Sequence, residues 1–148
     1  MKLFLLTLIV VLSGYCTFAQ QPVHWKFSSK KLDDKTYELH ITATIDDGWH
    51  IYAQKQPEDA IAQPTSIKFK NNPLIVFNGT TNEVGKMEKH KIEALGIEQY
   101  QYSQAVDFVQ KVKLINSVKA DVSGSVIFQV CTDEMCLPPK EEAFSLSF

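Results

Sequence analysis

The chain has 148 residues and a formal net charge of −2, and its fifteen basic side chains are all lysine. This length fits one domain with its own hydrophobic core. Proteins that bind nucleic acids concentrate positive charge and exploit the arginine fork, so the composition argues against that class. The sequence has no GxSxG motif and no glycine-rich phosphate loop, so we expect neither a serine hydrolase nor a bound cofactor.

The first nineteen residues have the features of a secretory signal peptide. Lys2 gives a positive start, residues 3–12 are almost wholly apolar, and small residues at 17 and 19 suit cleavage after Ala19. The apolar run is too short for a stable membrane span. Cys16 raises the alternative of a lipoprotein anchor, but Tyr15 stands where that signal needs a small residue. We therefore expect a secreted domain over residues 20–148 with no membrane span of its own.

Alternation of apolar and polar residues predicts an all-β domain. The clearest signal runs from Tyr37 to Ile45, where every second residue is apolar, as in a half-buried antiparallel strand. Further strands are predicted at 24–28, 49–52, 65–70, 74–77, 100–115, 126–130 and 144–148. Seven or eight short strands separated by turns, with no helix of ten residues, favour a β-sandwich.

Two segments between these strands are predicted to be loops. Residues 53–63 contain no periodic pattern and have prolines near both ends. Residues 78–96 are polar and contain three glycines, so we interpret them mainly as a long excursion, with at most a short helical turn near 86–95. Long loops in compact domains are uncommon and often functional.

The most distinctive chemistry lies between Val130 and Glu141, where Cys131 and Cys136 occur on an acidic, turn-like segment. An apolar, β-branched strand precedes the pair. Pro138 and Pro139 follow it, and they end a strand ladder because they have no backbone donor. After signal cleavage these are the only two cysteines, in a compartment where disulfides persist.

The residues alone leave three uses of this pair open. A purely structural bridge across so small a loop would stabilise the fold by roughly 2 kcal/mol. A redox pair would cycle between dithiol and disulfide, because close spacing lets one thiol resolve a mixed disulfide formed by the other. The neighbouring Asp133 and Glu134 would disfavour a thiolate, so a reduced pair should react efficiently only with a docked partner.

The third use is a soft-metal site in which Met135 and a histidine join the two cysteines. No zinc-type spacing accompanies them. We interpret His40 as a residue on the solvent face of a strand and His90 as a loop residue, and His24 and His50 are the other two histidines. We therefore expect no metal.

Three stretches resemble the N-terminal periplasmic domain of the bacterial thiol–disulfide transporter DsbD. They are Asp47–Tyr52, Glu83–Lys86 and Gln129–Pro139. The last stretch is the most specific, because cysteine, a short acidic spacer, cysteine, one apolar residue and two prolines are hard to obtain by chance.

The resemblance implies an immunoglobulin-like antiparallel β-sandwich in the periplasm with protein-disulfide reductase activity. Such a domain takes reducing equivalents from a thioredoxin-like domain or membrane thiol transporter and passes them to oxidised periplasmic proteins, including disulfide isomerases and cytochrome c maturation factors. Cys136 corresponds to the cysteine that forms mixed disulfides, and Cys131 to the resolving thiol. The alternative is a non-catalytic binding module in which the Cys131–Cys136 bridge only stiffens a loop.

The resemblance also implies an environment for the pair. Neighbours of the active site would be His50, Tyr52, Asp133, Glu134 and Pro138. A cap loop over the disulfide would consist of Glu83, Val84, Gly85 and Lys86.

This sequence departs from the best-known members of the family. Its spacer is one residue shorter, His50 replaces a tyrosine, and Glu83 and Val84 replace the aromatic residues of the cap. No membrane region or thioredoxin-like domain precedes Phe148, so the electron donor is expected to be a separate protein.

Overall fold

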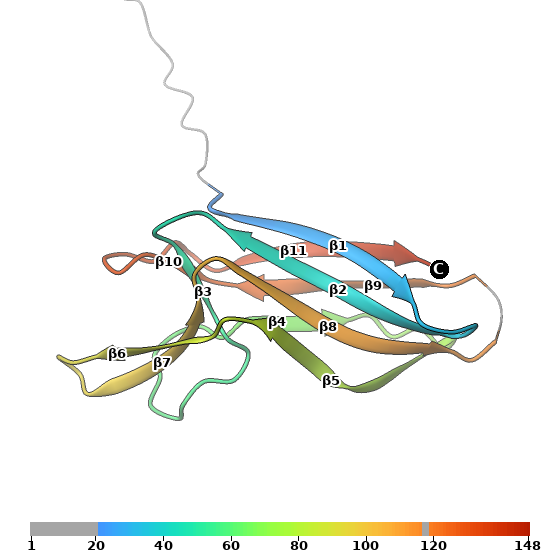
Figure 1. Cartoon of the computed structure of the whole chain (residues 1–148), viewed down its shortest axis with the longest axis horizontal. Helices are drawn as coiled ribbons and strands as arrows, with labels where there is room; N and C mark the ends of the chain where they lie inside the picture. The colour runs from blue at the N-terminus through green and yellow to red at the C-terminus, as the bar shows by residue number, and fades with distance from the viewer. Residues whose placement is uncertain (1–20, 117–118) are drawn as a thin grey trace, which may run out of the picture.

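The computed structural model describes residues 21–116 and 119–148, so the predicted signal peptide lies outside the described residues (Figure 1). The described chain forms eleven strands in three antiparallel sheets. The first sheet contains, in spatial order, β1 (Val23–Lys31), β2 (Thr36–Ile45), β8 (Ala105–Leu114) and β5 (Ile75–Gly85). The second contains β11 (Lys140–Ser147), β9 (Asp121–Phe128) and β4 (Ser66–Phe69). The third contains β10 (Val130–Cys131), β3 (His50–Tyr52), β7 (Ile97–Tyr102) and β6 (Glu88–Ile92).

The first two sheets pack face to face and form the predicted β-sandwich. Rings from opposite sheets meet between them, with centroid distances of 5.1 Å for Trp25 and Phe128 and 4.7 Å for Phe69 and Phe77. Such pairs add about 0.5–1.5 kcal/mol each to the gain from burying the rings. No helix among the described residues is long and apolar enough to cross a membrane.

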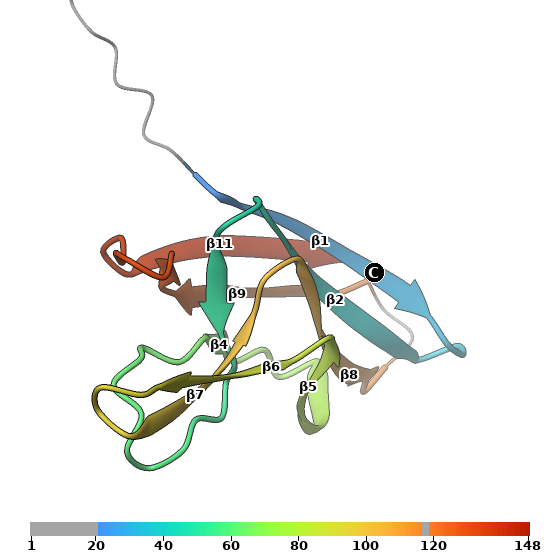
Figure 2. The same ribbon diagram turned by 60° about the vertical axis from the view of Figure 1, so that its left-hand side comes forward.

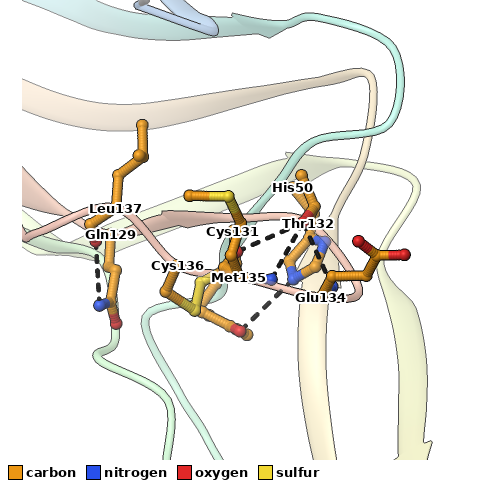
Figure 3. Close-up of a disulfide and its surroundings, with 9 residues drawn as sticks. His50, Gln129, Cys131, Thr132, Glu134, Met135, Cys136 and Leu137 are labelled. Carbon is orange, nitrogen blue, oxygen red and sulfur yellow. Dashed lines mark hydrogen bonds between the residues drawn. A yellow bond between two sulfur atoms is a disulfide. The ribbon is translucent and has the colours of Figure 1, made fainter.

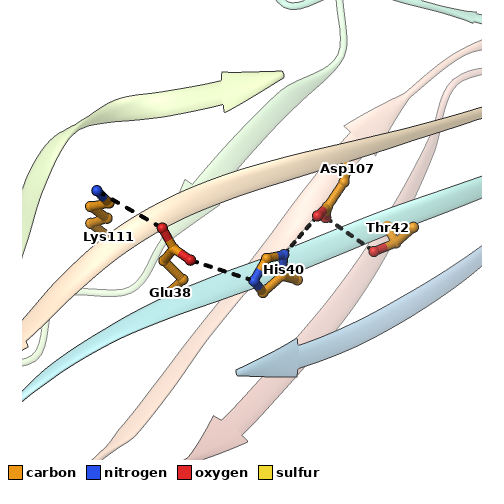
Figure 4. A network of polar contacts seen from close by, with 5 residues as sticks. All are labelled: Glu38, His40, Thr42, Asp107 and Lys111. Carbon is orange, nitrogen blue, oxygen red and sulfur yellow. Dashed lines mark hydrogen bonds and ion pairs between the residues drawn. The ribbon is translucent and has the colours of Figure 1, made fainter. Parts of the chain in front are cut away.

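The alternation predicted for β2 is confirmed. Its apolar face from Leu39 to Ile45 is buried, with Leu39 and Ile41 completely inaccessible to solvent. The polar face carries a network in which His40 Nδ1 lies 2.6 Å from Asp107 Oδ2 and the Thr42 hydroxyl donates to Asp107 Oδ1 at 3.0 Å (Figure 4). His40 is therefore a partly exposed strand residue, as predicted, and it is held by the neighbouring strand β8.

The buried face of β8 includes one polar residue, Gln110, and β5 explains why. The register between β5 and β8 shifts between Asn78 and Asn82, where Gly79 has a φ of 71°. Gln110 Nε2 donates to the Asn78 carbonyl at 3.1 Å, and Gln110 Oε1 accepts from the Thr81 hydroxyl at 2.9 Å. The buried amide thus satisfies backbone groups that the irregular ladder leaves unpaired.

The prediction of a long excursion at 78–96 is wrong. Strand β5 continues to Gly85, and β6 and β7 form a hairpin that turns at residues 93–96, with Gly96 at a φ of 68°. The pattern was hidden because most of β5 beyond Phe77 and two of the five residues of β6 are exposed, so little selects for apolar residues there. His90 consequently lies in β6 and not in a loop. The predicted short helical turn is reduced to the turn of this hairpin, where the amide of Gly96 donates to the Ile92 carbonyl at 2.9 Å, the i→i+4 pattern of one helical turn.

Two further sequence predictions need correction. The run 100–115 is not one strand, because a turn at Ser103 and Gln104 separates β7 from β8. The expected seven or eight strands are eleven, since this split, the break between β9 and β10 and the extra strand β6 all add to the number. The loop predicted at 53–63 is confirmed, because no strand lies between Tyr52 and Ser66.

The third sheet extends beyond one end of the sandwich. Figures 1 and 2 both show the segment after β10, the β6–β7 hairpin and the loop after β3 gathered at this end, away from the C-terminus. Strands far apart in the sequence thereby bring three connecting segments together, and the cysteine pair lies in one of them.

Candidate functional site

Cys131 and Cys136 are joined by a disulfide with an S–S distance of 2.01 Å (Figure 3). The two residues also form an isolated antiparallel bridge, which brings their Cα atoms to 4.0 Å. Thr132 builds the turn between them: its amide donates to the Met135 carbonyl at 2.8 Å, and its hydroxyl accepts from the amide of Met135 at 3.1 Å. Threonine commonly stabilises a turn in this way.

The two sulfur-bearing residues differ in their environment. Cys131 belongs to β10, lies directly opposite His50 of β3, and has no exposed surface. Cys136 belongs to the turn that follows and is exposed. A nucleophile from solvent or from a partner can therefore reach Cys136, whereas Cys131 is shielded by the third sheet.

A pocket of about 450 Å³ adjoins Cys136. One wall is the segment 132–136, and another is the loop after β3 through Ile61 and Ala62. The other lining residues are Gln129, between β9 and β10, and five residues of the third sheet, namely His50, Tyr52, His90, Ile92 and Gln99. His50 and Tyr52 lie on the same face of β3, and His90 pairs with Gln99 across β6 and β7.

Burial makes the two aromatic residues nearest the disulfide electrically neutral near pH 7. Burial lowers the pKa of His50 from its usual 6.5, and the negative charge of Asp133 opposes this only in part. Burial and the same carboxylate raise the pKa of Tyr52 above 10.0. The His50 Nε2 and Tyr52 hydroxyl lie 3.4 Å apart, with their rings edge to face. Asp133 and Glu134 are the two carboxylates that line the pocket.

Four of the five predicted neighbours gather beside Cys136: His50, Tyr52, Asp133 and Glu134 all line the pocket. Pro138 is exposed further along the same segment and does not line it. Sequence reasoning gave no role to Gln99 or Ile61, and it took His90 for a loop residue. Pairing of β6 with β7 places His90 and Gln99 here, whereas the strand predicted from the sequence began only at residue 100.

The four residues of the expected cap are not brought to this pocket. Glu83, Val84 and Gly85 end β5, Lys86 lies in the turn to β6, and none of the four lines the pocket. Glu83 has a different set of contacts. Its carboxylate accepts the amide of Gln54 at 2.6 Å and the hydroxyl of Tyr102 at 2.9 Å.

Glu83 thereby fixes the start of the loop after β3, which supplies one wall of the pocket. The pKa of Tyr102 is raised, first by burial and then by its hydrogen bond to this carboxylate. The hydroxyl is therefore protonated and can donate near neutral pH.

The histidines are dispersed among the described ranges. His24 contacts Asp46, His40 contacts Asp107, and only His50 and His90 share the pocket. Within residues 21–116 and 119–148 no group of three or more histidine, cysteine, aspartate or glutamate side chains is arranged to hold a metal ion.

Together the fold and the site define an all-β, immunoglobulin-like sandwich that carries one partly accessible disulfide at its end. The sequence matches the family described as "Thiol:disulfide interchange protein DsbD, N-terminal" over residues 17–147, and the chain therefore belongs to this family. No curated protein matches the sequence.

Two solved structures confirm the fold. The reduced N-terminal domain of DsbD from Neisseria meningitidis has a TM-score of 0.52 at 18% identity, over 82% of this chain and 84% of that one. The N-terminal periplasmic domain of ScsB from Proteus mirabilis has a TM-score of 0.55 at 13% identity, over 86% of this chain and 46% of that one. The present chain thus spans less than half of the ScsB domain.

Proposed function

We propose that this domain exchanges electrons with protein partners in the periplasm through the Cys131–Cys136 pair, as a protein-disulfide reductase. The observation that carries the proposal is the asymmetry of the pair, with an exposed Cys136 and a fully buried Cys131. Thiol–disulfide exchange needs one accessible sulfur and a second close enough to resolve the mixed disulfide. Family membership supports the same class of chemistry.

In the reductive half of the proposed cycle, a thiolate of a thioredoxin-like donor attacks Sγ of Cys136. The intramolecular disulfide breaks, Cys131 leaves as a thiolate and takes up a proton, and a mixed disulfide joins the donor to Cys136. The second thiol of the donor then attacks its own sulfur in this bond and releases Cys136. The donor becomes a disulfide, and the domain gains two electrons and two protons.

In the oxidative half, the Cys136 thiolate attacks a disulfide of a periplasmic acceptor. One acceptor sulfur leaves as a thiol, and the other forms a mixed disulfide with Cys136. Deprotonated Cys131 then attacks Sγ of Cys136, which releases the second acceptor thiol and restores the bridge. Cys131 reacts only with Cys136 and never needs to meet a sulfur of the partner in either half, in agreement with its burial.

The reduction potential of the pair tests this proposal. It is measured by equilibrating the protein in glutathione or dithiothreitol buffers, alkylating the free thiols and weighing the products. A potential of about −270 to −180 mV would let physiological partners both reduce and oxidise the pair. A potential well below about −300 mV would mark a structural bridge and refute the proposal.

The doubly substituted protein Cys131→Ser/Cys136→Ser gives a second test. It should remain folded and lose all exchange with a thioredoxin-like donor, because the strands of the sandwich do not depend on the bridge. Retention of all partner-dependent effects, with lower stability as the main change, would favour a binding module with a structural disulfide.

A further inference from the structure

The pocket beside Cys136 contains a buried hydrogen-bond acceptor that has no partner. Gln99 lines the pocket and is only 4% exposed, and its Oε1 makes no hydrogen bond within the described chain. Buried polar atoms of this kind are rare and costly. The last side-chain torsion of glutamine is broad and roughly two-fold, so rotation about it can turn this oxygen toward a donor that enters the pocket.

The carboxylates that line the pocket carry negative charge. Asp133 and Glu134 line it, and Glu88 is close enough to act on His50. No lysine among the described residues lines the pocket. Lys89 and Lys91 of β6 lie on the opposite face of that strand from His90 and Ile92, and Lys89 Nζ lies 5.4 Å from the centroid of the Tyr100 ring.

Two histidines and one tyrosine are the remaining titratable groups that face the pocket. Burial lowers the pKa of His50 and raises that of Tyr52, so both are neutral near pH 7 and do not oppose the carboxylates. His90 faces the pocket from β6. A positively charged group is thus the ligand that complements both the carboxylates and the orphan oxygen.

Apolar side chains form part of the wall, and two of them are exposed to solvent. Ile61 is 70% exposed and Met135 is 52% exposed, and both line the pocket on opposite connecting segments. Ile92 adds a third apolar side chain from β6. Such walls suit the aliphatic stem of a lysine or arginine, whose charged head then extends to polar groups.

We propose that this pocket receives a lysine or arginine side chain of the protein partner, carried on the segment next to the partner's reacting cysteine. The stem packs between Ile61 and Met135, the charged head donates to Gln99 Oε1, and Asp133 and Glu134 attract it. This inference rests on the proposed function, because the partner's cysteine must reach Cys136 for its neighbour to enter the pocket. The pocket then selects among partners by the residue beside their cysteine.

The test uses the Cys131→Ser protein, which keeps Cys136 as its single thiol once the signal peptide is absent. The probes are short peptides with one cysteine activated as a mixed disulfide with thionitrobenzoate. The Cys136 thiolate attacks the peptide sulfur, forms a protein–peptide disulfide and releases the coloured thionitrobenzoate anion. The measured quantity is the second-order rate constant at constant pH and low salt.

Matched peptides carry lysine or norleucine at each of two positions on either side of the cysteine. Norleucine keeps the stem and removes the charge, so the lysine-to-norleucine ratio isolates the charged head. We expect a ratio of about 10 at the best position, because hydrogen bonds to charged groups are the stronger ones. The ratio should fall as salt is added.

Variants locate the preference within the protein. Gln99→Met, which removes the acceptor at nearly constant shape, and Asp133→Asn/Glu134→Gln should each bring the ratio close to one. Gln101→Met is the matched control, because Gln101 Oε1 is also buried and unpaired but does not line the pocket. Glu141→Gln, on the exposed edge of β11, controls for a loss of negative charge elsewhere.

The outcomes separate the two proposals. A ratio near one for the parent protein, with both peptides reacting, overturns the cationic pocket and leaves the exchange function intact. A ratio that survives both pocket variants also overturns the pocket. Failure of every peptide to react with Cys136 overturns the exchange function and this inference with it. If Gln99→Met does not fold, the surface pair Asp133→Asn/Glu134→Gln decides alone.

Discussion

The burial of Cys131 predicts that the two reduced thiols are alkylated at very different rates. Two single-thiol proteins are compared. Cys131→Ala retains only the thiol of Cys136, and Cys136→Ala retains only the thiol of Cys131. To reach Cys131, a reagent needs β10 to separate from β3, which breaks the register pairs Val130–Ile51 and Cys131–His50.

The magnitude follows from what this opening disrupts. Two backbone hydrogen bonds at about 1 kcal/mol net each give an opening cost of about 2 kcal/mol. Since 1.4 kcal/mol is a factor of ten, Cys131 should be protected about 30-fold. This is a lower bound, because opening also exposes Val130, which is 2% exposed in the closed state.

The assay is alkylation by iodoacetamide, followed by mass, of each single-thiol protein in its native state and in concentrated urea. The ratio of the two rates cancels the intrinsic reactivity of each thiol. Cys136 should be protected only a few-fold and Cys131 at least about 30-fold. Equal protection of the two thiols would refute the asymmetry on which the proposed exchange depends.

Three further predictions concern a residue of the pocket, a residue that fixes its loop and a residue of the sandwich. Burial holds the pKa of His50 below 6.5 in the folded protein, so the neutral histidine contributes its full stability above pH 6.5 and loses it as the pH falls through the lowered pKa of the folded state. His50→Phe should therefore flatten the acid side of a plot of urea midpoint against pH. An unchanged plot would contradict this. Glu83→Ala removes both acceptors for the Gln54 amide and the Tyr102 hydroxyl, so urea unfolding should show a loss of about 1–3 kcal/mol and limited proteolysis should become faster at residues 53–65; equal cleavage rates would exclude this role in fixing the loop. Gly124→Ala would place Cβ 2.3 Å from the backbone oxygen of Lys68, and unfolding should show a loss of about 1–3 kcal/mol; full stability would mean that β4 and β9 can move apart freely.

The sequence predicted the sandwich where one face of a strand is buried. The apolar residues of β2 and β8 recur at period two because their inner faces form the core, and both strands were found on that signal. The cysteine segment was found for another reason. Two cysteines and two prolines within eleven residues form a motif that can be recognised in the sequence without knowledge of the fold.

The predictions were less accurate where a strand is exposed on both faces or where the site depends on pairing. The later part of β5 and β6 show no clear period because neither face is consistently buried. Gln99 enters the site only through its register with His90, a pairing between strands that no local pattern specifies. Glu83 was placed near the disulfide by resemblance, and the structure assigns its carboxylate instead to Gln54 and Tyr102.

The acidic turn between the cysteines connects the two proposals. Carboxylates next to a thiol disfavour its thiolate, so Asp133 and Glu134 slow the reaction of Cys136 with arbitrary disulfides. A cationic side chain that enters the pocket offsets this negative field at the moment when the partner's cysteine arrives. The same two carboxylates would then suppress exchange with unsuitable partners and promote it with suitable ones. This is specificity by repulsion as well as attraction, and it needs no movement of the fold.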